Sequence, residues 1–113
     1  MDKGDLVRVR HMLDAAREAR SFTRQQTRRS LDENRMLALS LVRCIEVVGE
    51  AAAQVSRQFQ EAHPEIPWPQ IVAMRNRLIH AYFDVDVDRL WDTVVDDLPP
   101  LVATLEQLVA RES

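Results

Sequence analysis

Five polar side chains lie close together within residues 75–82 (RNRLIHAY), and their types suit proton transfer and phosphate binding. They are Arg75, Asn76, Arg77, His80 and Tyr82. The imidazole of a histidine has an unperturbed pKa near neutrality, so His80 can both accept and donate a proton. The guanidinium of Arg75 can hold a phosphate and stabilise negative charge that develops on a pentacoordinate phosphorus. Because RNA carries its own nucleophile, the 2′-hydroxyl, these groups would need no metal and no other cofactor.

Helical geometry sets a condition on how these groups can meet. If the segment is helical, with about 100° of rotation per residue, Asn76 and His80 share a face. Arg75 and His80 would then lie about 140° apart. They converge only if the helix ends near His80 or if the Arg75 side chain wraps around it. Two copies meeting across a two-fold axis would bring the groups together more easily.

The elements that position this segment are predicted to be helices, because apolar residues recur at spacings of three and four along most of the chain. The first expected helix ends near residues 20–22, and a short helix follows over 24–29. The longest is expected over 31–61, about 45 Å in length, and begins with the capping-box pattern Ser30–Glu33. Two more are expected over 68–80 and from the turn at 84–88 to Leu98, with a last segment after Pro99 and Pro100. The pattern predicts an all-α fold: an antiparallel bundle of about five to six helices in a single domain, residues 1–113.

Small residues and one acid stand out in the long predicted helix. Gly49 and Ala51–Ala53 form a patch that would let another helix approach closely. Glu50 lies inside it, either as an ordinary boundary residue or as a buried partner for an arginine. On the first helix, Asp5 is expected on the surface, away from the apolar stripe.

Charge is unevenly distributed along the 113 residues. The net charge is −3, yet residues 1–81 hold 13 basic and 10 acidic side chains whereas residues 82–113 hold 2 basic and 8 acidic. Fourteen of the fifteen basic residues are arginines, whose planar fork suits phosphate oxygens. The overall charge does not indicate a nucleic-acid-binding protein, so affinity for RNA must come from a local patch or from a cleft in an oligomer.

Several classes of site are disfavoured. Asp84, Asp86 and Asp88 have the wrong spacing for an EF-hand, which would need glycine where Arg89 stands. The sequence shows no His/Cys cluster typical of zinc and no glycine-rich phosphate loop. Cys44 is the single cysteine, and we expect no signal peptide and no membrane span, which favours a cytoplasmic location.

Arg75 is followed after four residues by His80, and His80 after one residue by Tyr82. This pattern resembles the signature of the HepT-type toxins of the HEPN ribonuclease superfamily. Other segments resemble family landmarks in the family's order. They are residues 45–52, 63–68, 83–86 and 97–99. The resemblance covers roughly residues 31–105, and the ordered set is much more specific than the short Arg–His pattern.

The resemblance implies a fold, an activity and partners. Such proteins are helical-bundle homodimers with the site in the cleft between subunits. They are metal-independent endoribonucleases, the toxins of a type VII-like toxin–antitoxin pair with a nucleotidyltransferase antitoxin of the MNT type. Arg75 and His80 would be the catalytic pair and Asn76 a polar site residue. Tyr82 would accept AMP from the antitoxin.

Other interpretations remain open from the residues alone. Arg77 is either a phosphate contact or a surface residue. His63 is expected to be a structural residue at a helix end and His11 a solvated one, and Trp68 and Trp91 are expected in the core or at an interface. The main alternative function is a non-catalytic helical dimer that partners a nucleotidyltransferase. A nucleotidyltransferase activity of the chain itself is disfavoured, because the sequence shows no Gly-Ser loop and no strand pattern.

Overall fold

The computed structural model describes residues 3–81 and 84–112, apart from the side chains of His80 and Ala81. The elements, in chain order, are α1 (Lys3–Phe22), α2 (Ser30–Glu33), α3 (Arg35–Gln54), α4 (Arg57–Ala62), α5 (Trp68–Val72), the 3-10 helix η1 (Arg75–Arg77), β1 (Ile79–Ala81), β2 (Asp84–Val85), α6 (Val87–Asp92), the π-helix η2 (Thr93–Asp97) and α7 (Leu98–Glu112). Helices dominate, which confirms the predicted all-α class. The one sheet in the described residues is the antiparallel hairpin of β1 and β2.

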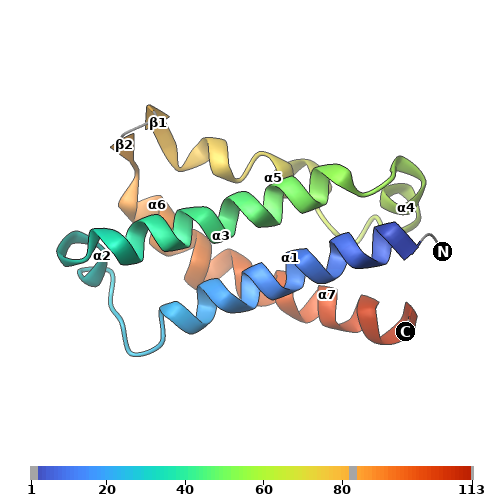
Figure 1. Ribbon diagram of the computed structural model, residues 1–113, viewed down its shortest axis with the longest axis horizontal. Helices are drawn as coiled ribbons and strands as arrows, with labels where there is room; N and C mark the ends of the chain where they lie inside the picture. The colour runs from blue at the N-terminus through green and yellow to red at the C-terminus, as the bar shows by residue number, and fades with distance from the viewer. Residues whose placement is uncertain (1–2, 82–83, 113) are drawn as a thin grey trace.

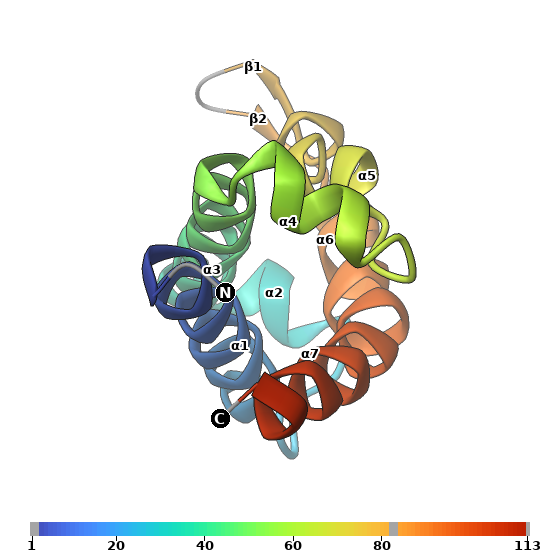
Figure 2. The ribbon, with the colours of Figure 1, turned by 90° about the vertical axis from the view of Figure 1, so that its right-hand side faces the viewer.

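The core lies between α1, α3 and α7. The two longest helices, α1 and α3, run antiparallel along the molecule, and α7 packs against α1 (Figures 1 and 2). Each helix contributes an apolar stripe that is fully buried, with members such as Met12 on α1, Ile45 on α3 and Leu105 on α7. Apolar burial of this kind is the main favourable contribution to folding, so these three helices form the scaffold of the protein.

The small-residue patch on α3 does allow a close approach, as predicted. A Cβ added at Gly49 would lie 3.3 Å from the carbonyl oxygen of Ile71 and 3.5 Å from that of Val72. Both carbonyls belong to α5, so this helix rests directly on the middle of α3. Ala52 is fully buried beside it. Glu50 proves to be an exposed residue, with its carboxylate 3.6 Å from Arg43.

The prediction of one long helix over 31–61 was wrong, because the chain breaks at two capping residues. Asn34 is extended (φ −134°, ψ 94°), and its side chain accepts a hydrogen bond from the amide of Leu37 at 3.1 Å, which starts α3. Ser56 (ψ 151°) caps α4 in the same way. The carboxylate of Asp5 accepts bonds from the Ser56 amide at 2.8 Å and from its hydroxyl at 2.7 Å. Asp5 is therefore buried and holds the second break, which corrects its expected surface position.

The short helix expected over 24–29 does not form. The Thr23 hydroxyl donates back to the Arg20 carbonyl at 2.9 Å, so it closes the end of α1 and does not open a new helix. Gln25 then adopts a positive φ of 61°, which is incompatible with a continuing right-handed helix. Residues 24–29 form turns that lead to α2.

The helix expected over 68–80 is also much shorter than predicted. It ends at Val72, and after a turn the chain forms one 3-10 turn, in which the amide of Leu78 donates to the carbonyl of Arg75 at 3.0 Å. The Leu78 carbonyl then accepts from the Asp86 amide at 2.6 Å, and Ile79 pairs with Val85. Pairing across the hairpin therefore replaces the helical bonds that the sequence pattern favoured.

The helix start expected at 84–88 is confirmed, but Asp84 and Val85 form strand β2 of the hairpin where a turn was expected. Asp86 caps α6, and its side chain accepts from the amide of Arg89 at 3.0 Å. The prolines Pro99 and Pro100 lie in the first turn of α7, directly after the π-helical turns of η2. A proline has no amide hydrogen to donate, so the helix changes its hydrogen-bonding pattern before them and continues. In the described part of the chain, no helix has the length and apolar character needed to cross a membrane.

Candidate active site

Arg75 occupies a defined position on η1. Its Nε donates a hydrogen bond to Oε2 of Glu46 on α3 at 2.8 Å, although the two residues are 29 positions apart in the sequence. The Arg75 side chain is 45% exposed and that of Glu46 is 24% exposed. This bond uses Nε, which leaves the two terminal nitrogens of the guanidinium as donors that a phosphate can bind.

Glu46 is a site residue that the sequence analysis missed. Its neighbours Ile45 and Val48 are fully buried, so the register of α3 is fixed by the core, and Glu46 points to the side of the helix where α5 and η1 lie. The sequence suggested an acidic partner for an arginine at Glu50 instead, one helical turn later. Glu46 and Glu50 are four residues apart, so both lie near one face of α3. This spacing is the sequence signal that could have identified Glu46.

His80 lies on β1 of the hairpin, and its backbone is described but its side chain is not. Tyr82, the predicted AMP acceptor, lies outside the described residues. The helical separation of about 140° expected for Arg75 and His80 does not apply, because the α-helix ends at Val72 and a strand follows η1. The expected condition was a helix that ends near His80, whereas the α-helix ends before Arg75 itself. The convergence of the two side chains stays a prediction.

Arg77 and Arg75 face different surfaces although both lie on η1. Arg77 lines a groove of about 430 Å³ together with Arg89 and the carboxylates of four aspartates, Asp86, Asp88, Asp92 and Asp97. Four carboxylates against two guanidinium groups make this groove unfavourable for an RNA phosphate. Asn76 is exposed between the two arginines. The structure thus does not bring Arg75 and Arg77 together on one surface, and the proposed contact of Arg77 with RNA stays untested.

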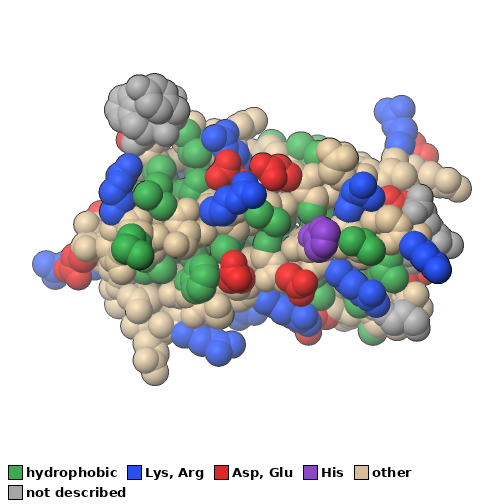
Figure 3. Space-filling view, viewed as in Figure 1, with side chains coloured by type: hydrophobic (Ala, Val, Ile, Leu, Met, Phe, Trp, Pro, Cys, Tyr) green, Lys and Arg blue, Asp and Glu red, His purple; other side chains and the backbone are tan. Residues whose placement is uncertain are grey.

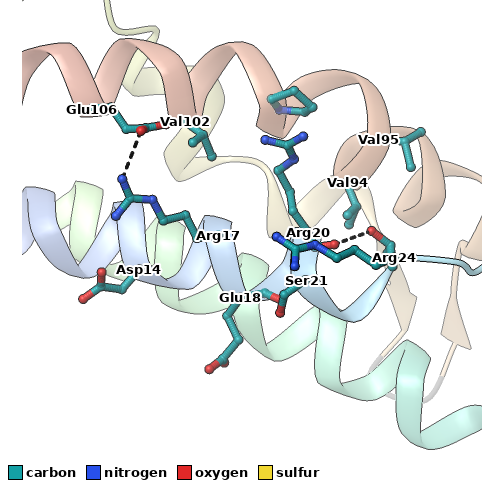
Figure 4. Close-up of a pocket in the computed structure, with 12 residues that line it drawn as sticks. Asp14, Arg17, Glu18, Arg20, Ser21, Arg24, Val94, Val95, Val102 and Glu106 are labelled. Atoms are coloured by element: carbon teal, nitrogen blue, oxygen red, sulfur yellow. Dashed lines mark hydrogen bonds and ion pairs between the residues drawn. The ribbon is translucent and has the colours of Figure 1, made fainter.

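A larger groove lies elsewhere, between the C-terminal half of α1 and the segment η2–α7. It has a volume of about 780 Å³, and its walls combine charged side chains with aliphatic ones such as Val94 and Val102 (Figure 4). Arg17 reaches across it to Glu106 on α7 at 3.1 Å. None of the five predicted site residues lines this groove, so its size does not mark the candidate chemistry.

The remaining histidines and possible ligands agree with structural roles. The His63 ring packs on Phe59 with ring centroids 4.4 Å apart, and the His63 carbonyl accepts from the Trp68 indole at 3.0 Å. His63 is therefore a structural residue at the end of α4, as predicted. His11 is exposed on α1. Among the residues that the structure describes, no three His, Cys, Asp or Glu side chains are grouped so that they could hold a metal ion.

The fold and this segment together define a class of protein: a small helical bundle that carries an arginine on a tight turn, five positions before a histidine on a hairpin strand. Known proteins give the class its family. The family described as ribonuclease HepT-like matches residues 12–108. The chain therefore belongs to the ribonuclease HepT-like family, which confirms the predicted resemblance and the predicted enzyme class, a ribonuclease.

Individual relatives agree with this assignment. The chain is 46% identical over 69 residues to the "Probable ribonuclease HepT" of Thermococcus cleftensis, a match that covers 61% of the chain and 63% of the relative. It is 33% identical over 95 residues to "Putative RNase MJ1380" of Methanocaldococcus jannaschii, covering 84% of the chain and 87% of the relative. The chain thus spans less than two thirds of the first relative and most of the second. No solved structure gives a significant match.

Proposed function

We propose that the chain is a metal-independent endoribonuclease in which Arg75 and His80 act on one phosphodiester of RNA. The observation that carries the proposal is the fixed position of Arg75. Its guanidinium is held to Glu46 at 2.8 Å, on a 3-10 turn that leads within three residues to the strand bearing His80. This arrangement supports a phosphate held beside the histidine, and the family supports RNA as the source of that phosphate.

The reaction follows from the functional groups. His80 removes the proton from the RNA 2′-hydroxyl, and the resulting oxygen attacks the adjacent phosphorus. The P–O5′ bond breaks, the leaving oxygen takes up a proton, and the products are a 2′,3′-cyclic phosphate and a 5′-hydroxyl. The terminal nitrogens of Arg75 stabilise the charge on the phosphorane. RNA provides the nucleophile, so no metal-activated water is required.

Glu46 has a positioning role in this scheme. A bond of 2.8 Å from Nε to a half-buried carboxylate fixes the direction of a long, flexible side chain before substrate binds. The carboxylate also lowers the net positive charge of the site, so RNA must be bound mainly through the two terminal nitrogens and through further contacts. Asn76, exposed beside Arg75, is a candidate for such a contact.

The test is cleavage of a labelled RNA in excess EDTA. We expect the wild-type protein to cleave it and to leave 2′,3′-cyclic phosphate ends, which are identified by mass spectrometry. His80→Ala should reduce the rate by about 100-fold or more, the usual contribution of general acid–base catalysis, with unchanged helical circular dichroism. His63→Ala serves as a matched control, because its packing on Phe59 is structural. A wild-type protein that binds RNA but never cleaves it would favour a non-catalytic module.

The proposal includes a role as the toxin of a type VII-like toxin–antitoxin pair that acts in the cytoplasm, where RNA and ATP are available. The partner would be an MNT-type nucleotidyltransferase that transfers AMP to Tyr82 and so places a phosphate close to the arginine of the motif. The resemblance of residues 75–82 to the family motif supports this role.

The intact mass of the protein after incubation with the partner and ATP should show AMP additions that the Tyr82→Phe variant lacks. Additions that persist in Tyr82→Phe would assign the acceptor to another residue.

The proposed enzyme is a homodimer. A single copy offers one guanidinium, already bonded to a carboxylate, and the net charge of the whole chain is −3. Binding of a polyanion is more favourable when two such sites share one cleft.

A further inference from the structure

The groove between α1 and the segment η2–α7 contains two arginines that have no acidic partner. Arg20 and Arg24 line this groove of about 780 Å³, and both residues are exposed. Within the part of the chain that the structure describes, neither side chain forms an ion pair. A guanidinium without a carboxylate beside it keeps its charge and its five N–H donors for a ligand.

The acids that line the groove do not cancel this charge. Glu106 is already paired with Arg17, which reaches it from α1 at 3.1 Å. Glu18 accepts a hydrogen bond from the thiol of Cys44 on α3 at 3.6 Å. Figure 4 shows that the side chains of Glu18 and Asp14 point away from α7, whereas the two unpaired arginines lie over the groove. The groove therefore has a surplus of positive charge where α1 ends.

Basic charge is concentrated in this part of the chain. Residues 17–29 hold five arginines and one acid, whereas the rest of the chain holds ten basic and 17 acidic side chains. The face formed by α1 and α3 has no such surplus, since Figure 3 shows basic and acidic side chains interspersed over it. The end of α1 and the turn after it thus form the kind of local patch that an acidic chain needs in order to bind RNA.

The basic turn is fixed to the element that follows the hairpin. Arg28 donates hydrogen bonds to Asp88 in the first turn of α6 and to Asp32 on α2. The strand β2 ends just before α6 begins, so this contact connects the turn with the hairpin that bears His80. The turn and the hairpin lie at the same end of the molecule (Figure 1).

The wall of the groove that faces the arginines is aliphatic. Val94 and Val95 on η2 contribute to it, together with Pro99 and Val102 on α7. A π-helical turn such as η2 is rare and is found frequently at functional sites. An aliphatic wall can remove one face of a nucleic-acid base from water, and the plane of a guanidinium can stack on the other face. The groove therefore offers contacts to both the phosphate and the base of a nucleotide.

The groove has few groups that could distinguish one base from another. Its two hydroxyl groups already donate their hydrogens to backbone carbonyls, that of Ser21 to Glu18 at 2.7 Å and that of Thr23 to Arg20 at 2.9 Å. Charged contacts to the backbone with little base recognition are typical of sites for single-stranded nucleic acid that tolerate many sequences.

We propose that this groove binds a single-stranded segment of the RNA substrate, outside the phosphodiester that is cleaved. The inference rests on the proposed function, which supplies RNA as the ligand. Arg20 and Arg24 each bind a backbone phosphate, and a base lies against the valines. The Arg17–Glu106 pair bridges α1 and α7 at one end of the groove, and the strand leaves at the other end over the basic turn (Figure 4).

The strand must cross the end of the molecule to reach the candidate active site. Figure 2 shows α1 and α7 at the edge opposite the hairpin, and the molecule measures 29 Å in this direction. Only an RNA of several nucleotides can therefore occupy both places. The groove acts as a second contact that strengthens the binding of long RNA and takes no part in the chemistry.

The first test measures the affinity for a labelled single-stranded 2′-O-methyl RNA, which lacks the nucleophile and is not cleaved, by fluorescence anisotropy at several salt concentrations. Arg20→Ala/Arg24→Ala should raise Kd by about 10-fold at low salt. A plot of the logarithm of the binding constant against the logarithm of the salt concentration should become less steep by about 1.4, because each phosphate contact to a single strand contributes about 0.7.

Arg57→Ala/Arg111→Ala is the matched control for this variant. It removes the same charge from two exposed arginines that do not line the groove, each paired with a glutamate, Glu61 at 3.8 Å and Glu65 at 3.6 Å. Affinity and salt dependence should both stay close to the wild-type values. Equal losses in the control and in the groove variant would mean that net charge alone determines the affinity, which overturns the proposal.

The second test increases the charge of the groove. Glu106→Gln removes the partner of Arg17 and leaves a third guanidinium available, so Kd should fall by about 3-fold and the plot should become steeper by about 0.7. Glu61→Gln releases Arg57 in the same way outside the groove, and it should change neither quantity. Circular dichroism checks that every variant is folded.

The contrary outcomes are distinct from one another. A wild-type chain that does not bind the RNA overturns the proposal. Unchanged affinity and salt dependence in Arg20→Ala/Arg24→Ala also overturn it and leave the groove to a different ligand, such as an acidic protein segment. Displacement of the RNA by an equal concentration of free AMP would assign the groove to a mononucleotide and would overturn the binding of a strand.

The binding measurement is independent of catalysis. Loss of affinity in the groove variant, together with no cleavage of natural RNA by the wild-type chain, would keep the groove and contradict the proposed function. Cleavage by the wild-type chain, together with unchanged binding by the groove variant, would keep the ribonuclease and overturn the groove. The two proposals therefore fail in different measurements.

Discussion

The helical scaffold and the segment that carries the candidate chemistry are built in opposite ways. The scaffold consists of α1 and α3, of 20 residues each, and α7, of 15 residues, all with continuous buried stripes. The chemical segment, residues 68–86, has a five-residue helix, one 3-10 turn and strands of three and two residues. None of the residues of η1 is buried. Regular structure stabilises the protein here, and irregular structure presents the side chains proposed to react.

The difference has a physical basis. A long helix satisfies its own backbone and fixes each side chain by packing, so its outward residues can only line a surface. Tight turns and hairpins expose side chains from several directions, but they bury little and are individually weak. The chemical segment is held by four side chains that reach the core, together with two specific contacts with α3. The buried side chains are Trp68, Ile71, Met74 and Leu78. The specific contacts are the close approach of α5 at Gly49 and the bond from Arg75 to Glu46.

The largest expected effect comes from removing the arginine of the chemical segment. Arg75→Ala should lower the RNA cleavage rate by about 100-fold or more, equivalent to about 3 kcal/mol of transition-state stabilisation. The free energy of unfolding should change by less than about 1 kcal/mol, because the Arg75–Glu46 pair is partly exposed. Growth inhibition by the expressed protein should disappear. Initial cleavage rates and urea denaturation measure the two effects separately.

Arg57→Ala is the matched control for this prediction, since it removes an exposed ion pair with Glu61 far from the motif in sequence. It should leave both quantities nearly unchanged. If Arg75→Ala keeps its activity, the division between scaffold and chemical segment does not locate the chemistry. If it unfolds the protein, Arg75 belongs to the scaffold.

The second prediction concerns the contact that joins the two regions. Gly49→Val should destabilise the protein by about 1–3 kcal/mol, because the added side chain meets the carbonyls of Ile71 and Val72, which belong to backbone and cannot rotate away. Cleavage by the folded fraction should also fall, since α5 carries η1 and a shift of about 1 Å at a site is costly. Urea denaturation and single-turnover cleavage rates give the two values.

Ala53→Val is the control for Gly49→Val, because Ala53 is exposed on the same helix. It should have little effect on either quantity. A stable Gly49→Val protein with normal activity would show that α5 and η1 are placed independently of α3, which would contradict the dependence described above.

The same contrast explains what the sequence could predict. The spacing of residues such as Val9, Ile45 and Leu105 reports burial along a helix, and it predicted the scaffold and the fold class. The close approach at Gly49 was predicted for a similar reason, since a run of small residues leaves room for a neighbour. These are local patterns that repeat within one helix.

The errors fall where a distant residue decides the local structure. The helix expected over 68–80 ends at Val72, and the chain goes on to a hairpin in which the Leu78 carbonyl bonds with the Asp86 amide, a pairing that helical periodicity does not report. The long helix breaks at Ser56 partly because Asp5, 51 positions away, binds it. Glu46 was missed for the same reason, since its partner lies 29 positions further along the chain. The motif itself was recognised by resemblance, and periodicity did not show it.

The smallest expected effect tests the scaffold by its buried thiol. Burial, followed by the nearby carboxylate of Glu18, raises the pKa of Cys44 to about 11 from a usual 9.0. At pH 8, a thiol reagent should modify the folded protein much more slowly than the protein in urea. As the pH rises, the thiol loses its proton in the unfolded state near pH 9 and in the folded state only near pH 11. The contribution of the thiol to the free energy of unfolding is therefore present below about pH 9 and is lost between about pH 9 and 11.

Two variants sharpen this last test. Cys44→Ala should remove the loss of stability between about pH 9 and 11, as measured by urea denaturation at several pH values. Adding Ser40→Cys to that background places a thiol on the exposed side of the same helix, where it should react at nearly the rate of the unfolded chain. Equal reaction rates for Cys44 and the thiol at position 40 in folded protein would mean that the core opens readily. The scaffold would then be as mobile as the segment it is proposed to hold, and the contrast between the two regions would be lost.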